Sequence, residues 1–253
     1  MRQVHWLLLI VLLWTGAIWY FVALSARGLI GIEVPSAAIM LGAIGMVAIT
    51  GIFVFKEGRW QAVGSWLALT FAARKNFSAY LAALIPAGLF AVGIGLLPIL
   101  GAKAAFDPVL SVGVLGLLIP VWIEEIVWRG YALPRLLEVH TPIQTGLILS
   151  IVWVLWHIPF YLMPGYNTWG MVGWLAWVPF YVVYTFYLTW LGVKTQFSVL
   201  LAMISHLAVN WFVSSTSPPF VENYVALLGA LILAPLTIHF MRLLKAKNAY
   251  VSA

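Results

Sequence analysis

Two adjacent carboxylates, Glu124 and Glu125, follow a run from Pro108 to Ile123 that carries no charge. A charged side chain deep in hydrocarbon costs about 2.5–3.5 kcal/mol on insertion scales, so in an apolar stretch it usually has a function or a charged partner. Glu125 and Arg129 are four residues apart, so on a helix they share a face and can form an ion pair. Glu124 points about 100° away from Glu125 and keeps a free carboxylate. We therefore interpret Glu124 as the reactive carboxylate and Glu125 as a supporting one.

Three more polar side chains fall inside later apolar stretches: His157, His206 and Asn210. Trp153 precedes His157 by one helical turn, so its ring can hold the imidazole in place. His206 and Asn210 have the same spacing and can direct two N–H donors at one point. A carboxylate and an imidazole that share a water molecule can remove its proton, and N–H donors can stabilise the oxyanion formed at an attacked carbonyl. Together with Glu124, these residues suit hydrolysis of an amide bond inside or at the edge of a membrane.

Each pattern also has a purely structural interpretation. The Glu-Glu-x-x-x-Arg pattern is compatible with a structural ion pair at a membrane boundary. An intramembrane histidine is compatible with a packing residue held by a hydrogen bond. His-x-x-x-Asn on one face is compatible with a polar link between helices. The occurrence of all three patterns in one half of the chain, separated by short connections, favours a single site.

Zinc is the alternative to a metal-free site. One glutamate and two histidines are a known ligand set for hydrolytic zinc with water in the fourth position, and Glu124, His157 and His206 would supply it. The His-Glu-x-x-His helix of many zinc proteases is absent. Such a zinc site would leave Glu125 as the base, although Glu125 is the carboxylate placed to pair with Arg129. We prefer a site without a cofactor and keep zinc as the alternative.

The composition is that of an integral membrane protein. Of 253 residues, 64% are hydrophobic and 8% are charged, and the mean hydropathy is +1.05, whereas a soluble domain has about 25% charged residues. The absence of cysteine excludes disulfides, thiolate metal sites and cysteine catalysis. The pI of about 9.7 arises from scattered Lys and Arg residues, so we assign them to membrane topology and expect no nucleic-acid partner.

Hydropathy predicts an all-α fold, a polytopic bundle of about eight transmembrane helices that forms a single transmembrane domain over residues 1–253. Spans of about 20 apolar residues are expected at 6–26, 35–55, 78–100, 107–128, 143–163, 170–191, 196–214 and 224–243. Residues 1–106 carry no recognised motif, 107–214 form the catalytic core, and 215–253 supply the last helix and a basic tail. The less hydrophobic stretch from Lys56 to Phe77 predicts an interfacial amphipathic helix or a long loop.

The charge of the connections predicts that both termini are cytoplasmic. With these spans, all of the 13 Lys and Arg residues except Arg27 and Lys103 fall on the side of the termini. Lys and Arg accumulate in cytoplasmic connections, and an even number of spans returns the chain to the side where it began. In this topology, Glu124 and Glu125 lie near the cytoplasmic end of their span.

In their order, the three motifs resemble those of the CPBP family of intramembrane proteases. This family includes the Rce1-like CAAX prenyl endopeptidases and the ABI relatives linked to bacteriocin processing or immunity. Its pattern is Glu-Glu-x-x-x-Arg, then Phe-x-x-x-His, then His-x-x-x-Asn or Asp, on successive helices. The matching residues in this chain are Glu124-Glu125-x-x-x-Arg129, Trp153-x-x-x-His157 and His206-x-x-x-Asn210, within about residues 110–212. Trp153 stands where the family usually has Phe and keeps an aromatic ring there.

The resemblance implies an eight-helix fold with a cavity open to the cytoplasm. It also implies that Glu124 and His157 activate water while His206 and Asn210 hold the oxyanion. Both a metalloprotease and a glutamate-type mechanism are attributed to the family, and the residues of this chain favour the second.

The sequence therefore predicts an intramembrane endopeptidase in a prokaryotic cell membrane, with its active site open to the cytoplasm. The predicted substrate is a membrane-associated or prenylated, CAAX-type protein or peptide, cleaved near its C-terminus, and the lipid bilayer is the other partner. One alternative is a non-proteolytic membrane binding, immunity or scaffold protein of the same fold. A transporter or proton relay is another, because intramembrane Glu and His also suit that work, although no inverted repeat is evident.

Overall fold

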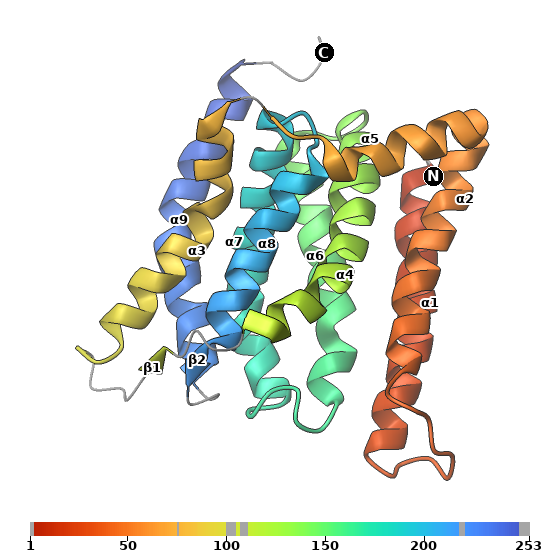
Figure 1. The fold of residues 1–253 in the computed structure, drawn as a ribbon, viewed down its shortest axis with the longest axis vertical. Coiled ribbons are helices and arrows are strands. Elements are labelled where there is room, and N and C mark those ends of the chain that lie inside the picture. Colours follow the sequence, from red (N-terminus) through yellow and green to blue (C-terminus); the bar gives the residue numbers. More distant parts are fainter. Residues whose placement is uncertain (1–2, 75, 100–104, 107–110, 218–220, 248–253) are drawn as a thin grey trace.

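The computed structural model describes residues 3–74, 76–99, 105–106, 111–217 and 221–247, which are largely helical (Figure 1). The α-helices are α1 (Gln3–Ala26), α2 (Ala38–Ala68), α3 (Phe77–Leu96), α4 (Ser111–Val127), α5 (Leu133–Leu137), α6 (Pro142–Leu162), α7 (Met171–Lys194), α8 (Val199–Ser214) and α9 (Val221–Lys247). A 3-10 turn, η1 (Leu69–Phe71), follows α2, and a π-helical turn, η3 (Trp128–Ala132), joins α4 to α5. The two-residue strands β1 (Ala105–Phe106) and β2 (Thr216–Ser217) pair antiparallel.

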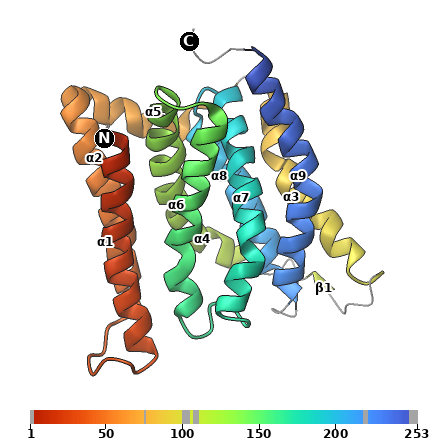
Figure 2. The same ribbon diagram turned by 180° about the vertical axis from the view of Figure 1, so that it is seen from behind.

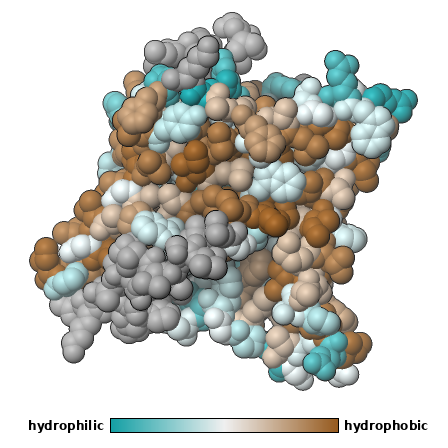
Figure 3. All heavy atoms as spheres, viewed as in Figure 1, coloured by the Kyte–Doolittle hydropathy of each residue, from teal (hydrophilic) through white to brown (hydrophobic). Residues whose placement is uncertain are grey.

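The described part of the chain contains six helices that are long and apolar enough to cross a membrane: α1, α2, α3, α6, α7 and α9. The remaining two predicted spans correspond to α4, with 17 residues, and α8, with 16 residues. In the space-filling view, hydrophobic residues cover much of the flank, and hydrophilic residues gather toward the two ends (Figure 3). The predicted all-α membrane bundle is confirmed, and the protein is an integral membrane protein.

Helix α1 begins and helix α9 ends at the same end of the bundle, on opposite flanks (Figures 1 and 2). We call this the basic end, because the described chain places there Lys56, Arg59, Arg74, Arg135, Lys194 and Arg242. The opposite end, which holds the connections 27–37 and 163–170, is called the far end. The termini share a side, as predicted, and their cytoplasmic assignment rests on the charge distribution.

Helix α2 bends at Gly58 and Arg59, where φ is −162° and 58°. Beyond the bend, α2 no longer runs beside α1 but lies across the basic end of the bundle (Figure 1). This segment falls in the stretch predicted to be an interfacial helix or a long loop, and it is helical as far as Phe71. Of the two alternatives predicted for this stretch, the structure shows the helix as far as Phe71.

The helix that carries the two glutamates continues past its predicted end through η3 and α5 to Leu137. All five residues of η3 are buried, so the π-helical turn is packed inside the basic end of the bundle. The next helix begins after Thr141, whose hydroxyl accepts a hydrogen bond from the Gln144 amide while the Gln144 side chain accepts one from the Thr141 amide. This capping box and a proline at the first helical position define the start of α6.

Candidate active site

Glu125 joins α4 to α8 through a buried ionic cluster. Its Oε1 atom accepts a hydrogen bond from Nη1 of Arg129 at 3.1 Å, so the predicted ion pair is present. The same oxygen lies 2.8 Å from Nδ1 of His206. Glu125 is 0% exposed and Arg129 is 2% exposed, and a carboxylate removed from water needs such partners because its desolvation is costly. The contact with His206 crosses between helices, so no spacing within one helix could indicate it.

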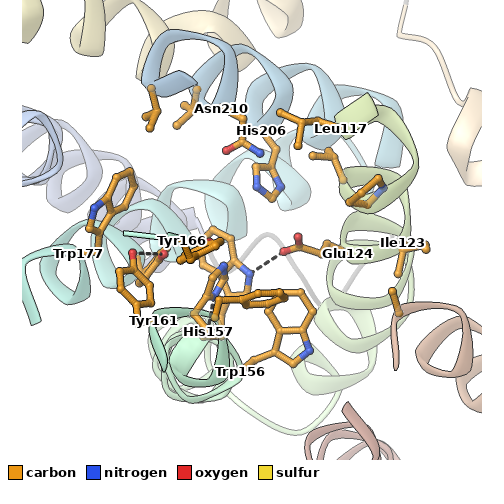
Figure 4. Close-up of a pocket in the computed structure, with 18 of the residues that line it drawn as sticks. Leu117, Ile123, Glu124, Trp156, His157, Tyr161, Tyr166, Trp177, His206 and Asn210 are labelled. Atoms are coloured by element: carbon orange, nitrogen blue, oxygen red, sulfur yellow. Dashed lines mark hydrogen bonds between the residues drawn. The ribbon is translucent and has the colours of Figure 1, made fainter. Parts of the chain in front are cut away.

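Glu124 points away from this cluster and into a cavity (Figure 4). Its Oε2 atom accepts a hydrogen bond from Nε1 of Trp153 at 2.9 Å. Among the described residues it forms no ion pair. A neutral N–H donor fixes the orientation of a carboxylate without neutralising its charge. The helix thus separates the two glutamates as predicted, and a tryptophan on α6 holds the one that faces the cavity.

Trp153 contacts several members of the site at once. Its indole N–H binds Glu124, and its ring meets His157 edge to face with 5.1 Å between centroids. The Arg129 guanidinium lies 5.1 Å from the same ring, within the range of a cation–π contact. A phenylalanine, the usual residue at this motif position, would keep the ring contacts but has no N–H donor. The departure from the motif therefore adds a hydrogen bond to the Glu124 carboxylate.

His157 is held in one tautomer by the backbone of its own helix. Its Nδ1 lies 2.7 Å from the carbonyl oxygen of Trp153, and because a carbonyl only accepts, Nδ1 carries the proton. The imidazole stacks on the Tyr181 ring with 4.4 Å between centroids. The neutral ring therefore keeps a lone pair on Nε2, the atom with which a histidine accepts a proton or binds a metal.

His206 is also held through Nδ1, in this case by the carboxylate of Glu125. An ionised carboxylate only accepts, so Nδ1 donates, and Nε2 can donate as well only when the ring is protonated. Asn210, one turn further along α8, lines the same cavity. Its side-chain amide donates hydrogen bonds without any change of protonation. The two predicted oxyanion donors therefore differ, because His206 donates from Nε2 only as an imidazolium, whereas the Asn210 amide donates in its ordinary state.

A cavity of about 400 Å³ brings the candidate catalytic side chains together. Glu124 from α4, His157 from α6 and both His206 and Asn210 from α8 line its wall (Figure 4). Of the supporting residues, Trp153 lines the wall, while Glu125 and Arg129 lie behind it. Much of the remaining wall is aromatic and includes Trp156, Phe160, Tyr161, Trp177, Tyr181 and Tyr184. Sequence reasoning missed these rings because a chain with 14 Trp, 10 Tyr and 14 Phe offers no signal that singles them out.

In the described ranges of the chain, no three His, Asp or Glu side chains are grouped so that they could hold a metal ion. The alternative zinc ligands Glu124, His157 and His206 line one cavity but are not assembled as a ligand set. We therefore derive no step through a metal.

The cavity lies toward the far end of the bundle. Its wall includes Tyr166 and Asn167 of the α6–α7 connection and Ser214 at the end of α8. On the other side, the buried η3 turn separates the site from the basic end. The prediction that the site opens to the cytoplasm stays a prediction, because the lining residues do not show through which side a substrate enters.

Residues 105–212 match the model of the family described as Type II CAAX prenyl endopeptidase Rce1-like. This stretch contains every candidate catalytic and supporting residue. The motif-bearing segment is thus similar to the Rce1-like family. CAAX prenyl protease 2 of Methanococcus maripaludis is 30% identical over 114 residues, which cover 42% of this chain and 39% of the archaeal protein. The predicted resemblance is thus confirmed for the Rce1-like segment, and helices α1, α2, α3 and α9 lie outside the family match.

Proposed function

We propose that the protein is an intramembrane endopeptidase that hydrolyses a peptide bond of a membrane-associated substrate in the Glu124 cavity. The observation that supports this most is the convergence of a carboxylate, two imidazoles and an amide on one cavity within an Rce1-like membrane bundle. The archaeal relative is named a CAAX prenyl protease, so prenylated, CAAX-type peptides are the first substrates to test. We place the protein in a prokaryotic cell membrane, with the lipid bilayer as its second partner.

In the proposed mechanism, Glu124 and His157 activate a water molecule. The indole of Trp153 orients the carboxylate, and the backbone contact of His157 leaves its Nε2 as an acceptor. One of these two groups accepts a proton from the water while the other orients it by a hydrogen bond. The water oxygen then forms a bond to the carbonyl carbon of the substrate.

Asn210 and His206 stabilise the oxyanion that this attack creates. The amide of Asn210 donates in its ordinary state, and His206 donates from Nε2 as an imidazolium whose charge is balanced by Glu125, 2.8 Å away. When the tetrahedral intermediate collapses, the C–N bond breaks and the proton taken from water passes to the leaving amine. Removal of one such donor typically lowers the rate by about 10²–10³.

The central test is the Glu124→Gln substitution in protein purified in detergent and assayed with prenylated and unprenylated labelled peptides. The glutamine oxygen still accepts from the Trp153 indole, so the fold is retained while the proton acceptor is lost. We expect cleavage to fall by about 10²–10⁴, the usual contribution of a general base. Glu33→Gln is the matched control, because Glu33 is exposed in the α1–α2 connection, and it is expected to cleave at the wild-type rate.

Three outcomes would redirect the proposal. Undiminished cleavage by Glu124→Gln would refute the assigned base. A wild-type protein that binds a peptide and never cleaves it, with binding unchanged by Glu124→Gln, would instead support a binding or immunity protein of the same fold. The third outcome is a zinc-dependent mechanism, which metal analysis of the same samples tests. Stoichiometric zinc that is lost together with activity in His157→Ala would support zinc catalysis in place of the metal-free mechanism.

A further inference from the structure

A second cavity lies on the flank of the bundle, where α7 runs between α6 and α9 (Figure 2). Its volume is about 420 Å³, within the range of about 300–1,000 Å³ that is usual for small-molecule sites. Thr237 and Met241 are buried in its floor, whereas Ile143 and Ile238 in its wall are 49% and 52% exposed. Because α6, α7 and α9 are long and apolar enough to cross a membrane, this flank groove faces lipid chains.

The flank groove has the length of one leaflet. On α9 its lining runs from Ala234 to Arg242, which is about 12 Å at 1.5 Å per residue. Half of the hydrocarbon core of a bilayer is about 15 Å thick. Arg242 and Ile143, in the first turn of α6, lie at the basic end, and Val182 lies near the middle of α7. The groove therefore extends from the membrane surface at the basic end toward the middle of the membrane.

Charge is confined to one end of the flank groove. Arg242 is the single charged residue in its described lining, is exposed, and forms no ion pair with another described residue. Apart from Thr237, the rest of the described lining is apolar. The first turn of α6, which contributes Ile143, adds the partial positive charge of a helix N-terminus at the same end. The lining therefore favours an anion at the basic end and an uncharged apolar chain along the remaining length.

From the length, the apolar lining and the position of Arg242, we propose that the flank groove binds one anionic phospholipid of the leaflet at the basic end. The acyl chain lies along Val182 and Ala234, and the phosphate lies at Arg242. Basic pockets between transmembrane helices bind anionic lipid headgroups in other membrane proteins. This binding does not depend on whether the Glu124 cavity is catalytic.

The bound chain packs behind the wall of the Glu124 cavity. Tyr181 and Tyr184 of α7 line that cavity. Val182, Val183 and Phe186 of the same helix line the flank groove. With 3.6 residues per turn, these two sets of side chains lie on opposite faces of α7. A lipid in the groove therefore supports the helix that contributes part of the cavity wall.

Native mass spectrometry of the purified protein in a fixed detergent tests the proposal with two lipids that carry the same oleoyl chains, phosphatidylglycerol and phosphatidylcholine. We expect the first phosphatidylglycerol to bind about fivefold more tightly, which is equivalent to about 1 kcal/mol for one cation near a lipid surface. The Arg242→Gln substitution is expected to abolish this preference. Lys194→Gln is the matched control, because it removes an exposed charge at the same end outside the groove, and it should keep the preference.

The Ala234→Phe substitution tests the chain-binding part, because the added ring occupies the apolar groove. We expect the affinity for both lipids to fall about tenfold, since exclusion of about two methylene groups from apolar contact has an effect of this size. Leu231→Phe is the control, because Leu231 is 70% exposed on the same helix and lies outside the groove. Thermal unfolding is the second measurement, because a lipid that binds the folded protein raises the midpoint, and Ala234→Phe should lose this rise.

Equal affinity of the wild-type protein for the two lipids overturns the assignment of the headgroup to Arg242. Loss of the preference in Lys194→Gln to the same extent as in Arg242→Gln overturns it as well. Unchanged binding of both lipids by Ala234→Phe overturns the groove as the site of the acyl chain. A dimer that forms in the wild-type protein and is absent from Ala234→Phe overturns the lipid as occupant and assigns the groove to a second copy of the protein.

Discussion

Two glutamate–arginine clusters lie on consecutive parts of the α4–η3–α5 segment and differ chiefly in burial. The inner cluster joins Glu125, Arg129 and His206, and the side chains of its ion pairs are at most 6% exposed. The outer cluster joins Glu57 on α2 to Tyr131 and Arg135, with the Glu57 and Arg135 side chains 30% and 25% exposed. The Tyr131 hydroxyl donates to Glu57 at 2.7 Å, and Nε of Arg135 donates to it at 2.9 Å.

The comparison shows that similar ion pairs contribute differently to stability at different depths in the protein. Water can solvate the outer charges when a partner is removed, so an exposed ion pair contributes little. The inner charges have no such replacement, and removal of one partner leaves the others buried and unpaired. The inner cluster also holds Nδ1 of His206 through Glu125, so its loss affects both the fold and the candidate site.

The Glu125→Gln substitution is expected to have the largest effect. It leaves Arg129 buried without a carboxylate, which typically lowers the free energy of unfolding by about 3–5 kcal/mol. Thermal or denaturant unfolding in a fixed detergent measures the loss, with Glu57→Gln as the matched change in the outer cluster. Equal losses for the two variants would mean that burial does not distinguish the clusters.

The Asn210→Ala substitution separates catalysis from stability on α8. Asn210 lies one turn from His206, but it lines the cavity and none of the inner-cluster contacts involves it. We expect kcat to fall by about 10²–10³ from the loss of an oxyanion donor, with KM and the unfolding midpoint close to wild type. A loss of stability as large as that of Glu125→Gln would place Asn210 in the structural cluster instead.

The Trp153→Phe substitution tests the link between the inner cluster and the cavity. Phenylalanine retains aromatic contacts with His157 but removes the N–H that holds Glu124, 2.9 Å away. We expect kcat/KM to fall about tenfold, equivalent to about 1.4 kcal/mol, with little loss of stability. Trp153→Leu, which also removes the ring, should unfold more easily; activity unchanged in Trp153→Phe would argue against a role for the indole N–H.

The Glu57→Gln substitution should have the smallest effect, about 0–1 kcal/mol on unfolding, as for other partly exposed ion pairs. Burial and, after it, the Glu57 carboxylate raise the pKa of Tyr131 above its ordinary value, so the phenol remains a donor at neutral pH and can still bind the glutamine oxygen. Unfolding measured at low and high salt should show that this small difference shrinks as salt rises. A loss above about 3 kcal/mol would show that the outer cluster behaves like a buried one.

Several features of the fold and site were predictable because they depend on neighbouring residues. Hydropathy located the helices, and the weaker hydrophobicity after Lys56 indicated the segment that lies across the basic end. The four-residue spacing indicated the ion pair between Glu125 and Arg129. By contrast, α8 begins at Val199 and not at the predicted residue 196, because the Ser198 side chain caps the helix there.

The sequence by itself determined a membrane bundle, the separate directions of the two glutamates and the residue types of a hydrolytic site. These follow from hydropathy and helical periodicity, which act over one helix at a time. The tertiary structure decided that His206 binds Glu125, that Trp153 binds Glu124, and that the cavity extends toward the far end. Each of these depends on how helices distant in the chain pack together, so no local pattern could contain it.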